Sequence, residues 1–244
     1  MPTSVSQSEI TCPRPRFVEH IFTSKRQVCL PQIRGPESQS FRGRVYHENV
    51  SLAQPATPPT AKDRVLNVAY ELFSTRGIRD VGIDEVIEKA GIAKATLYRH
   101  FPSKDDLVRA FLRQREQEWT HGVVEAGALQ RGSTPHDQLL AIFDILDEWF
   151  HTKEFEGCSF INILLEMGSD HPLGQASIVH LKNIREIVFG LATEAGIADP
   201  DGFAHSWHIL MKGSIVAAGE GDLDAAKRAK DMARCLIEAH GLGA

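Results

Sequence analysis

The sequence predicts an all-α protein, and two observations support this fold class. From Ala61 onward, apolar residues recur at helical spacing through several segments, and no convincing stretch alternates with the two-residue period of a strand. These segments are bounded by helix-start and helix-stop signals, such as Thr-x-x-Asp at Thr60 and the glycines Gly77 and Gly132. Within this class we expect an N-terminal three-helix unit and a larger C-terminal helical domain.

Residues 1–58 are expected to form a disordered, Pro-rich extension. Eight of the 12 prolines lie at or before Pro59, Ser and Gln are frequent, and no helical or strand period is sustained. Such a composition buries too little apolar surface to fold alone. Its Arg and Lys residues could add nonspecific affinity for nucleic acid, but an inert tail or a misassigned start explains the segment equally well. No apolar run suits a signal peptide or a membrane span, so we expect a cytoplasmic protein.

Residues 59–105 are expected to form the three-helix unit. The run Thr60-Ala61-Lys62-Asp63 resembles a capping box, in which a hydroxyl and a carboxylate satisfy free N–H groups of a first turn. The helix that it starts should stop near Gly77 and support two shorter helices that meet around Gly91. The apolar faces of these two helices are formed by Ile83, Val86, Ile87 and Ala90, and then by Ile92, Leu97 and Phe101. This pattern predicts a helix-turn-helix.

The second helix of that pair has the composition of a DNA-reading helix. Such a helix needs polar residues outside and apolar residues inside, and Leu97 and Phe101 are the expected inner pair. The expected DNA contacts are Lys94, Thr96, Tyr98, Arg99 and His100, together with Lys104 at the start of the next helix. No carboxylate lies between Lys94 and Phe101, which suits a helix next to phosphates. A surface helix with a chance cluster of cations is the alternative on composition alone.

The run from Ala90 to Lys104, AGIAKATLYRHFPSK, resembles the DNA-binding domain of TetR-type (AcrR-like) transcriptional regulators, and the resemblance extends over residues 61–112. It implies that Lys94, Thr96, Tyr98 and His100 contact bases or phosphates and that Lys104 contacts phosphate. Two positions depart from the family pattern. Gly82 and Ala93 stand where a hydroxyl residue commonly starts a helix, and each replacement removes a hydroxyl cap.

The charge of the chain is unevenly distributed. The formal net charge is -5, but residues 1–60 carry +3, residues 61–117 carry +2 and residues 118–244 carry -10. The overall acidity therefore does not argue against DNA binding, because the acidic groups lie in the C-terminal part.

The C-terminal part, residues 106–244, is expected to form one helical domain. A helix that opens at Ser103 should continue towards Trp119. Further helices are expected over residues 135–150, 158–167, 176–194, 203–219 and 222–240. The first of these is apolar around most of its circumference, which predicts burial on more than one side.

The last two expected helices are candidates for self-association. Gly213, Ala217 and Ala218 would allow close approach of another helix, although the same faces also suit packing within one chain. A single recognition helix reads few base pairs, whereas a two-fold dimer places two in successive major grooves. The family resemblance implies a four-helix dimer interface, and we expect a homodimer.

Chemistry in the C-terminal domain receives little support from the sequence. The four cysteines lack Cys-x-x-Cys spacing, and Cys158 is either a reactive thiol at a helix start or, more simply, a buried inert one. His205 and His208, with Glu166 or His180, could bind a metal, but ordinary core or surface histidines explain them better. No nucleophile elbow, phosphate-binding glycine loop or dinucleotide motif is present. We therefore expect no catalytic residue, metal or cofactor.

The family resemblance also implies a cavity for an unknown small-molecule effector in this domain. Candidate lining residues are Trp119, Phe143, Phe150, Phe160, His180, Trp207, His208 and Met211. The sequence thus predicts a ligand-responsive transcriptional regulator that binds an operator in double-stranded DNA as a homodimer and acts as a repressor. The alternatives are a helical protein-interaction module without sequence-specific DNA binding and an enzyme that uses the C-terminal cavity.

Overall fold

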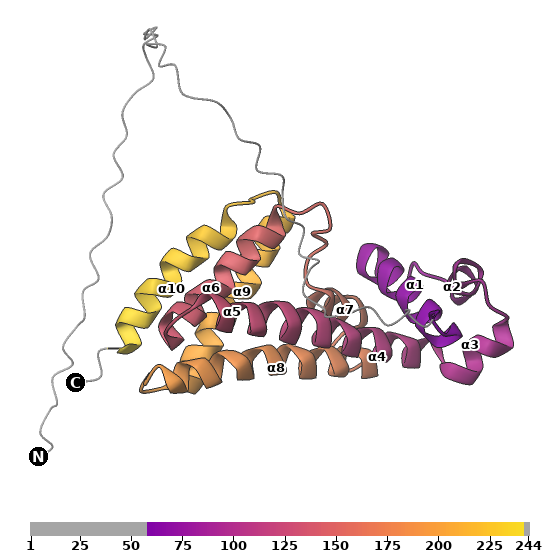
Figure 1. Ribbon diagram of the computed structural model, residues 1–244, viewed down its shortest axis with the longest axis horizontal. Helices are drawn as coiled ribbons and strands as arrows, with labels where there is room; N and C mark the ends of the chain where they lie inside the picture. The colour runs from indigo at the N-terminus through magenta and orange to yellow at the C-terminus, as the bar shows by residue number, and fades with distance from the viewer. Residues whose placement is uncertain (1–57, 242–244) are drawn as a thin grey trace, which may run out of the picture. The chain divides into compact units, whose positions relative to one another are not determined.

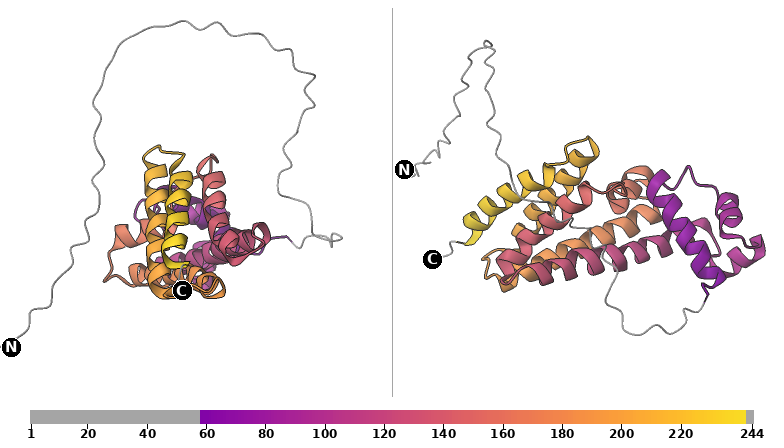
Figure 2. Two further views of the ribbon diagram at one scale, coloured as in Figure 1. Left: turned by 90° about the vertical axis from the view of Figure 1, so that its left-hand side faces the viewer. Right: turned by 45° about the horizontal axis from the view of Figure 1, so that its top comes forward.

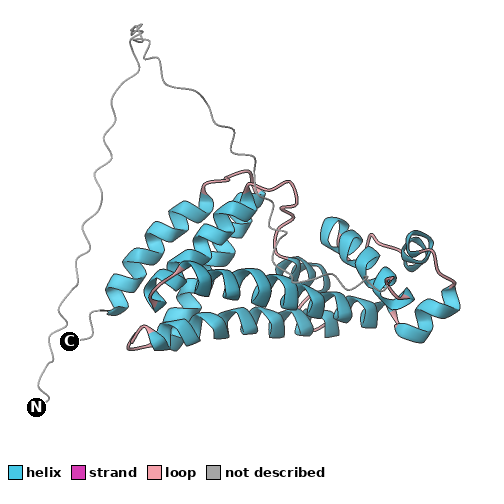
Figure 3. Ribbon diagram, in the orientation of Figure 1, coloured by secondary structure: helices cyan, strands magenta, loops and turns pink. Residues whose placement is uncertain are grey.

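The computed structural model describes residues 58–241, and this part of the chain contains helices and no strand (Figure 3). The extension expected over residues 1–58 therefore lies almost wholly outside the described residues. The helices, shown in Figure 1, are α1 (Ala61–Arg76), α2 (Ile83–Ala90), α3 (Lys94–His100), α4 (Lys104–Arg115), η1 (Glu116–Glu125), α5 (Ala126–Arg131), α6 (Pro135–Phe150), α7 (Ser159–Met167), α8 (Pro172–Glu194), α9 (Pro200–Gly219) and α10 (Ala225–Gly241). The all-α prediction is confirmed.

Local capping explains the ends of the first helices. Thr60 accepts from the backbone N–H of Asp63 at 3.2 Å and the Asp63 carboxylate accepts from the Thr60 N–H at 3.0 Å, so the predicted capping box is present. Gly91 ends α2 in the left-handed region, at φ 61°, where a glycine has no Cβ penalty. Gly82 and Ala93 precede α2 and α3 without a side-chain cap, as their residue types predicted.

The helix that follows Pro102 is longer than expected. Ser103 caps it by accepting from the Asp106 N–H at 3.1 Å. From Lys104 the α-helix α4 continues into the π-helical segment η1 and then into α5, so that helical structure persists to Arg131. This continuous helical segment, α4 to α5, runs beside α8 (Figure 1) and ends at Gly132. It joins the three-helix unit to the C-terminal helices.

Two helix starts in the C-terminal part lie earlier than the sequence indicated. The helix expected over residues 176–194 begins earlier, because Pro172 occupies the first turn of α8 and His171 caps it by accepting from the Leu173 N–H at 3.1 Å. Asp199 caps α9 in the same way, and Pro200 starts it, three residues before the expected Phe203. A proline fits a first helical turn because its missing N–H has no partner there anyway. By contrast, α10 starts at Ala225, later than the expected Asp222.

Two apolar clusters hold the helices together. One is formed inside the C-terminal part, where α6, α9 and α10 pack on one another (Figure 2). The other contains the inner residues of α1 to α4 and extends to Phe160 and Ile163 of α7 and to Leu173 and Leu181 of α8. The three-helix unit therefore shares its apolar core with the C-terminal helices. Within residues 58–241, no helix combines the length and the apolar character needed to cross a bilayer.

Candidate nucleic-acid interface and interior cavity

Two buried side chains fix the orientation of α3: Leu97 within the helix and Phe101 directly after it. The polar and cationic side chains of α3 therefore face outward. Leu97 is fully buried and Phe101 is 3% exposed, as predicted. Lys94, Tyr98 and Arg99 are exposed, and the side chains of Tyr98 and Arg99 form no hydrogen bond or ion pair with any other residue in the range 58–241. These two side chains are available to a ligand of the helix.

Lys94 has a partner that the sequence reading missed. Its ammonium lies 3.0 Å from Asp84 Oδ1, a carboxylate in the first turn of α2, and this hydrogen bond raises the pKa of Lys94. Both side chains are mostly exposed to solvent. An ion pair of this kind contributes little stability, so a phosphate can displace the carboxylate at small cost.

The other three predicted contact residues are only partly accessible. Thr96, His100 and Lys104 are half-buried. His100 lines a groove with Lys62, Arg109 and Arg113, between α1 and α4. Lys104 is the first residue of α4, and its ammonium donates to the Ile78 carbonyl at 2.5 Å. Contact between Lys104 and a phosphate therefore requires this side chain to leave, or share, its bond to the loop after α1.

Glu166 of α7 binds the backbone of the same loop. Its two carboxylate oxygens accept from the N–H groups of Ile78 at 2.9 Å and Arg79 at 2.5 Å. Gly77 precedes these residues with φ 80°, and a Cβ at this position would lie 3.1 Å from Glu166 Oε2. Glu166 had been considered as a metal ligand, but in the structure it connects the C-terminal part to the three-helix unit.

An interior cavity opens between α4, η1, α6, α7, α8 and α9. Of the eight residues predicted to line it, four do: Trp119, Phe160, His208 and Met211. Phe143, Phe150 and Trp207 instead belong to the packed core of the C-terminal part. The other lining residues are Arg115, Val124, Leu146, Trp149, Cys158, Ser159, Ile161, Leu181, Ile184, Lys212 and Ile215. The volume open to the centre of a water molecule is about 30 Å³, enough for very few waters.

His180 does not line this cavity. Its ring stacks on Phe160 with a centroid distance of 5.1 Å, and its Nδ1 lies 2.9 Å from Glu116 Oε1. Burial alone would raise the pKa of Glu116, but hydrogen bonds from His180 and Asn183 outweigh burial and lower it. His180 therefore lies next to the cavity wall, and its Nδ1 contacts the carboxylate of Glu116.

Two cavity residues have strongly altered acidity. Burial, with the charge of Lys212 nearby, lowers the pKa of His208 to about 3, so this histidine is neutral at physiological pH. Burial also raises the pKa of the Cys158 thiol. A raised pKa favours the inert thiol over the reactive one, because the thiolate is the nucleophile.

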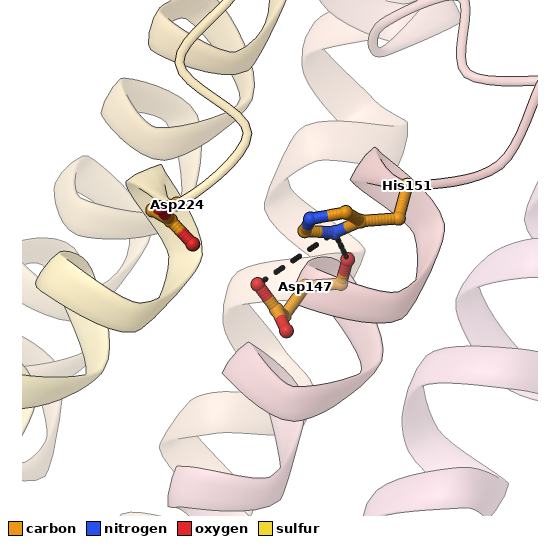
Figure 4. A group of neighbouring side chains, drawn as sticks. All are labelled: Asp147, His151 and Asp224. Atoms are coloured by element: carbon orange, nitrogen blue, oxygen red, sulfur yellow. Dashed lines mark hydrogen bonds and ion pairs between the residues drawn. The ribbon is translucent and has the colours of Figure 1, made fainter. Parts of the chain in front are cut away.

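The structure does not bring His205 and His208 together as ligands of a common metal site. His205 is exposed whereas His208 is buried. Within residues 58–241 the one group of three potential ligands is Asp147, His151 and Asp224 (Figure 4). The Lys227 ammonium lies 2.7 Å from Asp224 and 3.8 Å from Asp147, so a lysine already supplies the positive charge there.

The residues that sequence reasoning missed are Asp84, Arg115 and Lys212. A signal existed for Arg115, because it lies four positions before Trp119 and shares its helix face. The arginine carbon Cζ is 5.2 Å from the Trp119 ring centroid. No comparable signal existed for Asp84, whose partner Lys94 belongs to another helix, or for Lys212, which reaches the cavity only through the packing of α9 against other helices.

Comparison with known proteins identifies relatives of the N-terminal part. Residues 65–111 match the family described as bacterial regulatory proteins, tetR family. The HTH-type transcriptional repressor KstR2 of Mycolicibacterium smegmatis is 29% identical over 89 residues, which are 36% of this chain and 42% of the relative. The HTH-type transcriptional activator FasR of the same species is 34% identical over 91 residues, 35% of this chain and 40% of the relative. This chain thus spans about two fifths of the length of these two curated relatives.

A solved structure extends the similarity to the C-terminal helices. SCO4454, a TetR-family transcriptional regulator from Streptomyces coelicolor, superposes with a TM-score of 0.68 at 27% identity. The superposition covers 74% of this chain and 95% of that one. The similarity includes both the three-helix unit and the helices that surround the cavity.

Proposed function

Because the chain belongs to the TetR family of bacterial transcriptional regulators, we propose that it represses transcription by binding a roughly palindromic operator in double-stranded DNA. One observation carries this proposal. The α3 helix is seated on the core by Leu97 and presents Lys94, Tyr98 and Arg99 outward. A short helix of this kind enters the major groove, where its outward side chains meet base edges and phosphates.

The six predicted DNA contacts divide into two roles. Tyr98, Arg99 and Lys104 supply donors for phosphate oxygens, which fix the position of the protein on the duplex. Lys94 and Thr96, in the first turn of α3, are assigned to base edges in the major groove. His100, at the end of α3, faces the groove with the cations Lys62, Arg109 and Arg113 and serves as a further phosphate contact.

A homodimer supplies the second recognition helix. On α9, Ile209 is 65% and Val216 is 52% exposed, and Gly213 lies between them on the same face. Met232 of the neighbouring α10 is 59% exposed. By contrast, Ala218, which had been a candidate for this face, is buried in the core of its own chain. We assign the exposed set Ile209, Gly213, Val216 and Met232 to the dimer interface.

An effector acts through the interior cavity. Drug-sized ligands occupy pockets of several hundred Å³, whereas the cavity admits about 30 Å³ of water centres. A ligand must therefore move the surrounding helices apart, and two of them, α4 and α7, contact the three-helix unit. A ligand that favours the widened arrangement shifts the population away from the DNA-binding one.

The proposal includes no catalysis and no cofactor, and it places the protein in the cytoplasm with its DNA. For an enzyme, Ser159 or Cys158 with His171 and Asp170 is the catalytic set to consider, but His171 does not line the cavity and instead caps α8. The competing proposal is a helical interaction module that does not read DNA sequence.

DNA binding by the purified protein tests the proposal. The full chain, and a form without residues 1–58, are titrated with the intergenic DNA upstream of the gene and with scrambled DNA at two salt concentrations. Saturable binding that prefers the native DNA and gives a palindromic footprint supports a regulator. Equal binding to scrambled DNA that disappears at the higher salt contradicts it, because a purely electrostatic contact behaves in this way.

A further inference from the structure

The interior cavity contains two cations and no carboxylate. Arg115 of α4 and Lys212 of α9 line it, and its other lining residues are apolar, aromatic or uncharged, with no Asp or Glu among them. Both cations are close enough to favour the thiolate of Cys158 in the cavity wall. Both cations are half-buried, and two positive charges without a carboxylate in a mainly apolar wall favour a negatively charged ligand.

Neither cation has an acidic partner in the part of the chain that the structure describes. Arg115 donates to the hydroxyl of Tyr70 at 2.8 Å and lies over the rings of Trp119 and Trp149, 5.2 and 5.8 Å from their centroids. The Lys212 ammonium forms no hydrogen bond or ion pair with any residue in the range 58–241. Glu156 is influenced by the charge of Arg115 but forms no ion pair with it.

A third polar group in the cavity wall is unpartnered. His208 is 3% exposed, and its Nδ1 is buried without a hydrogen-bond partner among the described residues. A buried polar atom without a partner costs free energy, which a bound ligand recovers. The remaining wall is mainly apolar and includes three large rings, those of Trp119, Trp149 and Phe160.

We propose that the effector is a small organic acid whose carboxylate binds between Arg115 and Lys212 and whose apolar or aromatic body packs on Trp119, Trp149 and Phe160. The inference rests on the proposed function, because it names the chemical class of the ligand for the same cavity. A guanidinium and an ammonium both form charge-assisted hydrogen bonds with a carboxylate. The aromatic rings favour a flat apolar body over a strongly hydrated one.

Arg115 also connects the cavity to the DNA-binding helices. Its hydrogen bond to Tyr70 reaches α1, and the Tyr70 ring packs edge-on against Phe111 of α4 with centroids 5.3 Å apart. A carboxylate that draws the guanidinium into the cavity competes with the Tyr70 hydroxyl for the same donors. Occupation of the cavity thereby removes a contact between α4 and α1.

Three matched probes test the ligand class: 2-naphthoate, 2-naphthamide and 2-naphthylmethylammonium, which share one aromatic body and differ in charge. Binding to the full-length protein is measured by calorimetry and by quenching of tryptophan fluorescence. We expect naphthoate to bind about 10-fold or more tightly than the amide, because hydrogen bonds to charged groups are worth a few kcal/mol. The ammonium should bind most weakly.

Substitutions locate the effect. Arg115→Met and Lys212→Met keep most of the apolar stem but remove the charge, and each should reduce the preference for naphthoate over the amide to about 3-fold or less. Lys182→Met is the matched control, because Lys182 is exposed on α8 and pairs with Glu186 outside the cavity. This variant should keep the preference unchanged.

A second readout tests the route to the DNA-binding helices. Naphthoate should weaken DNA binding by the wild type, and Tyr70→Phe, which removes the hydroxyl that Arg115 contacts, should reduce that weakening while naphthoate still binds. Equal effects of naphthoate on DNA binding in both proteins would overturn the route through Tyr70.

The outcomes separate this inference from the proposed function. If the unliganded protein binds its operator but naphthoate and the amide bind equally, or none of the probes binds at millimolar concentration, the organic-acid class is wrong and the regulator stands. If the unliganded protein reads no DNA sequence, the proposed function fails. In that case a preference for naphthoate that depends on Arg115 and Lys212 still establishes an anion site.

Discussion

At the scale of single residues, the surface proposed to face DNA depends on how each of its cations is paired. Lys94 is held by Asp84, Lys104 is held by the Ile78 carbonyl, and Arg99 has no hydrogen-bond or ion-pair partner in residues 58–241. These three cations therefore differ in how readily they can contact a phosphate. Removing a competing partner should strengthen DNA binding more than removing an unrelated charge nearby.

We expect Asp84→Asn to tighten binding to any DNA by about 3- to 10-fold, because it frees Lys94 and removes a carboxylate next to the phosphates. The dependence of affinity on salt should steepen by up to about one unit of slope. Titrations at several salt concentrations measure both effects. Glu88→Gln, on the same helix and also exposed, serves as the control, and an equal gain for this variant would contradict the specific role of Asp84.

The second prediction at this scale concerns pH. The pKa of His208 is lowered from 6.5 to about 3 in the folded protein, so below pH 6.5 the unfolded chain binds a proton that the folded one does not. The stability that the folded protein gains by keeping His208 neutral is fully present above pH 6.5 and is lost progressively as pH falls towards 3. Lowering the pH from 7.5 to 5 should therefore reduce the free energy of unfolding by about 1–2 kcal/mol.

His208→Met should remove that part of the pH dependence. Denaturant unfolding of wild type and variant at pH 7.5 and 5, at one protomer concentration, measures the difference. His205→Met on the same helix is the control, because His205 is exposed. If the stability of His208→Met depends on pH as strongly as that of the wild type, groups other than His208 are responsible for the dependence.

At the scale of elements, the short helices α2 and α3 begin without side-chain caps, whereas α1, α4 and α6 begin with capping hydroxyls. The free N–H groups at the two uncapped starts remain available to solvent or to an anion. The proposed recognition helix α3 and its neighbour α2 thus lack a stabilising cap that the longer helices α1, α4 and α6 have.

Ala93→Ser should stabilise the protein by about 1 kcal/mol, because the Ala93 backbone has extended angles, φ -76° and ψ 146°, that suit a capping serine. Thermal unfolding monitored by circular dichroism checks the change. Thr60→Ala should shift stability in the opposite direction by a similar amount, since it removes an existing cap. A serine at position 93 without any stabilising effect would mean that its hydroxyl does not reach the backbone of α3.

At the scale of the whole molecule, one carboxylate connects distant parts of the chain. Glu166 binds the backbone of Ile78, 88 positions away in the sequence, and belongs to α7, a helix of the cavity wall. Ile78 and Ile163 of α7 also belong to the shared apolar cluster. Movement of α7 therefore acts directly on the loop between α1 and α2.

Glu166→Ala should lower the free energy of unfolding by about 1–3 kcal/mol, because the N–H of the buried Ile78 loses its acceptor. It should also speed hydrogen exchange at Ile78 and Arg79 and weaken operator binding. Hydrogen-exchange mass spectrometry and DNA titration measure these effects. Glu194→Ala, at an exposed position on α8, is the control. Unchanged exchange in Glu166→Ala would contradict the role given to this contact.

The second prediction at this scale concerns assembly. Val216→Glu places a charge on the proposed dimer face and should give a monomer with operator affinity reduced at least about 10-fold, because burying an unpaired charge costs several kcal/mol. Light scattering after size exclusion measures the mass. Leu165→Glu is the control, because Leu165 on α7 is 78% exposed and lies outside that face. A dimeric Val216→Glu protein would place the interface elsewhere.

The helical class, most helix ends and the inner residues of α3 could be predicted from the amino-acid sequence. Helix caps and apolar periods depend on residues within a few positions of one another, so they are visible in a single stretch of chain. The capping box at Thr60 and the buried Leu97 are examples. Even the longer α8 followed a local rule, since Pro172 at its first turn could have been read as a start.

Which side chains share the cavity, which cations are paired and which groups Glu166 binds depend on the packing of helices that are distant in the sequence. Arg115 and Lys212 are 97 positions apart and meet because α4 and α9 line the same space. Phe143, Trp207, Trp119 and Met211 all pack in or against the same apolar core, yet of these four only Trp119 and Met211 also line the cavity. Apolar character predicts burial alone, whereas packing between distant helices decides whether a buried residue faces a cavity or another side chain.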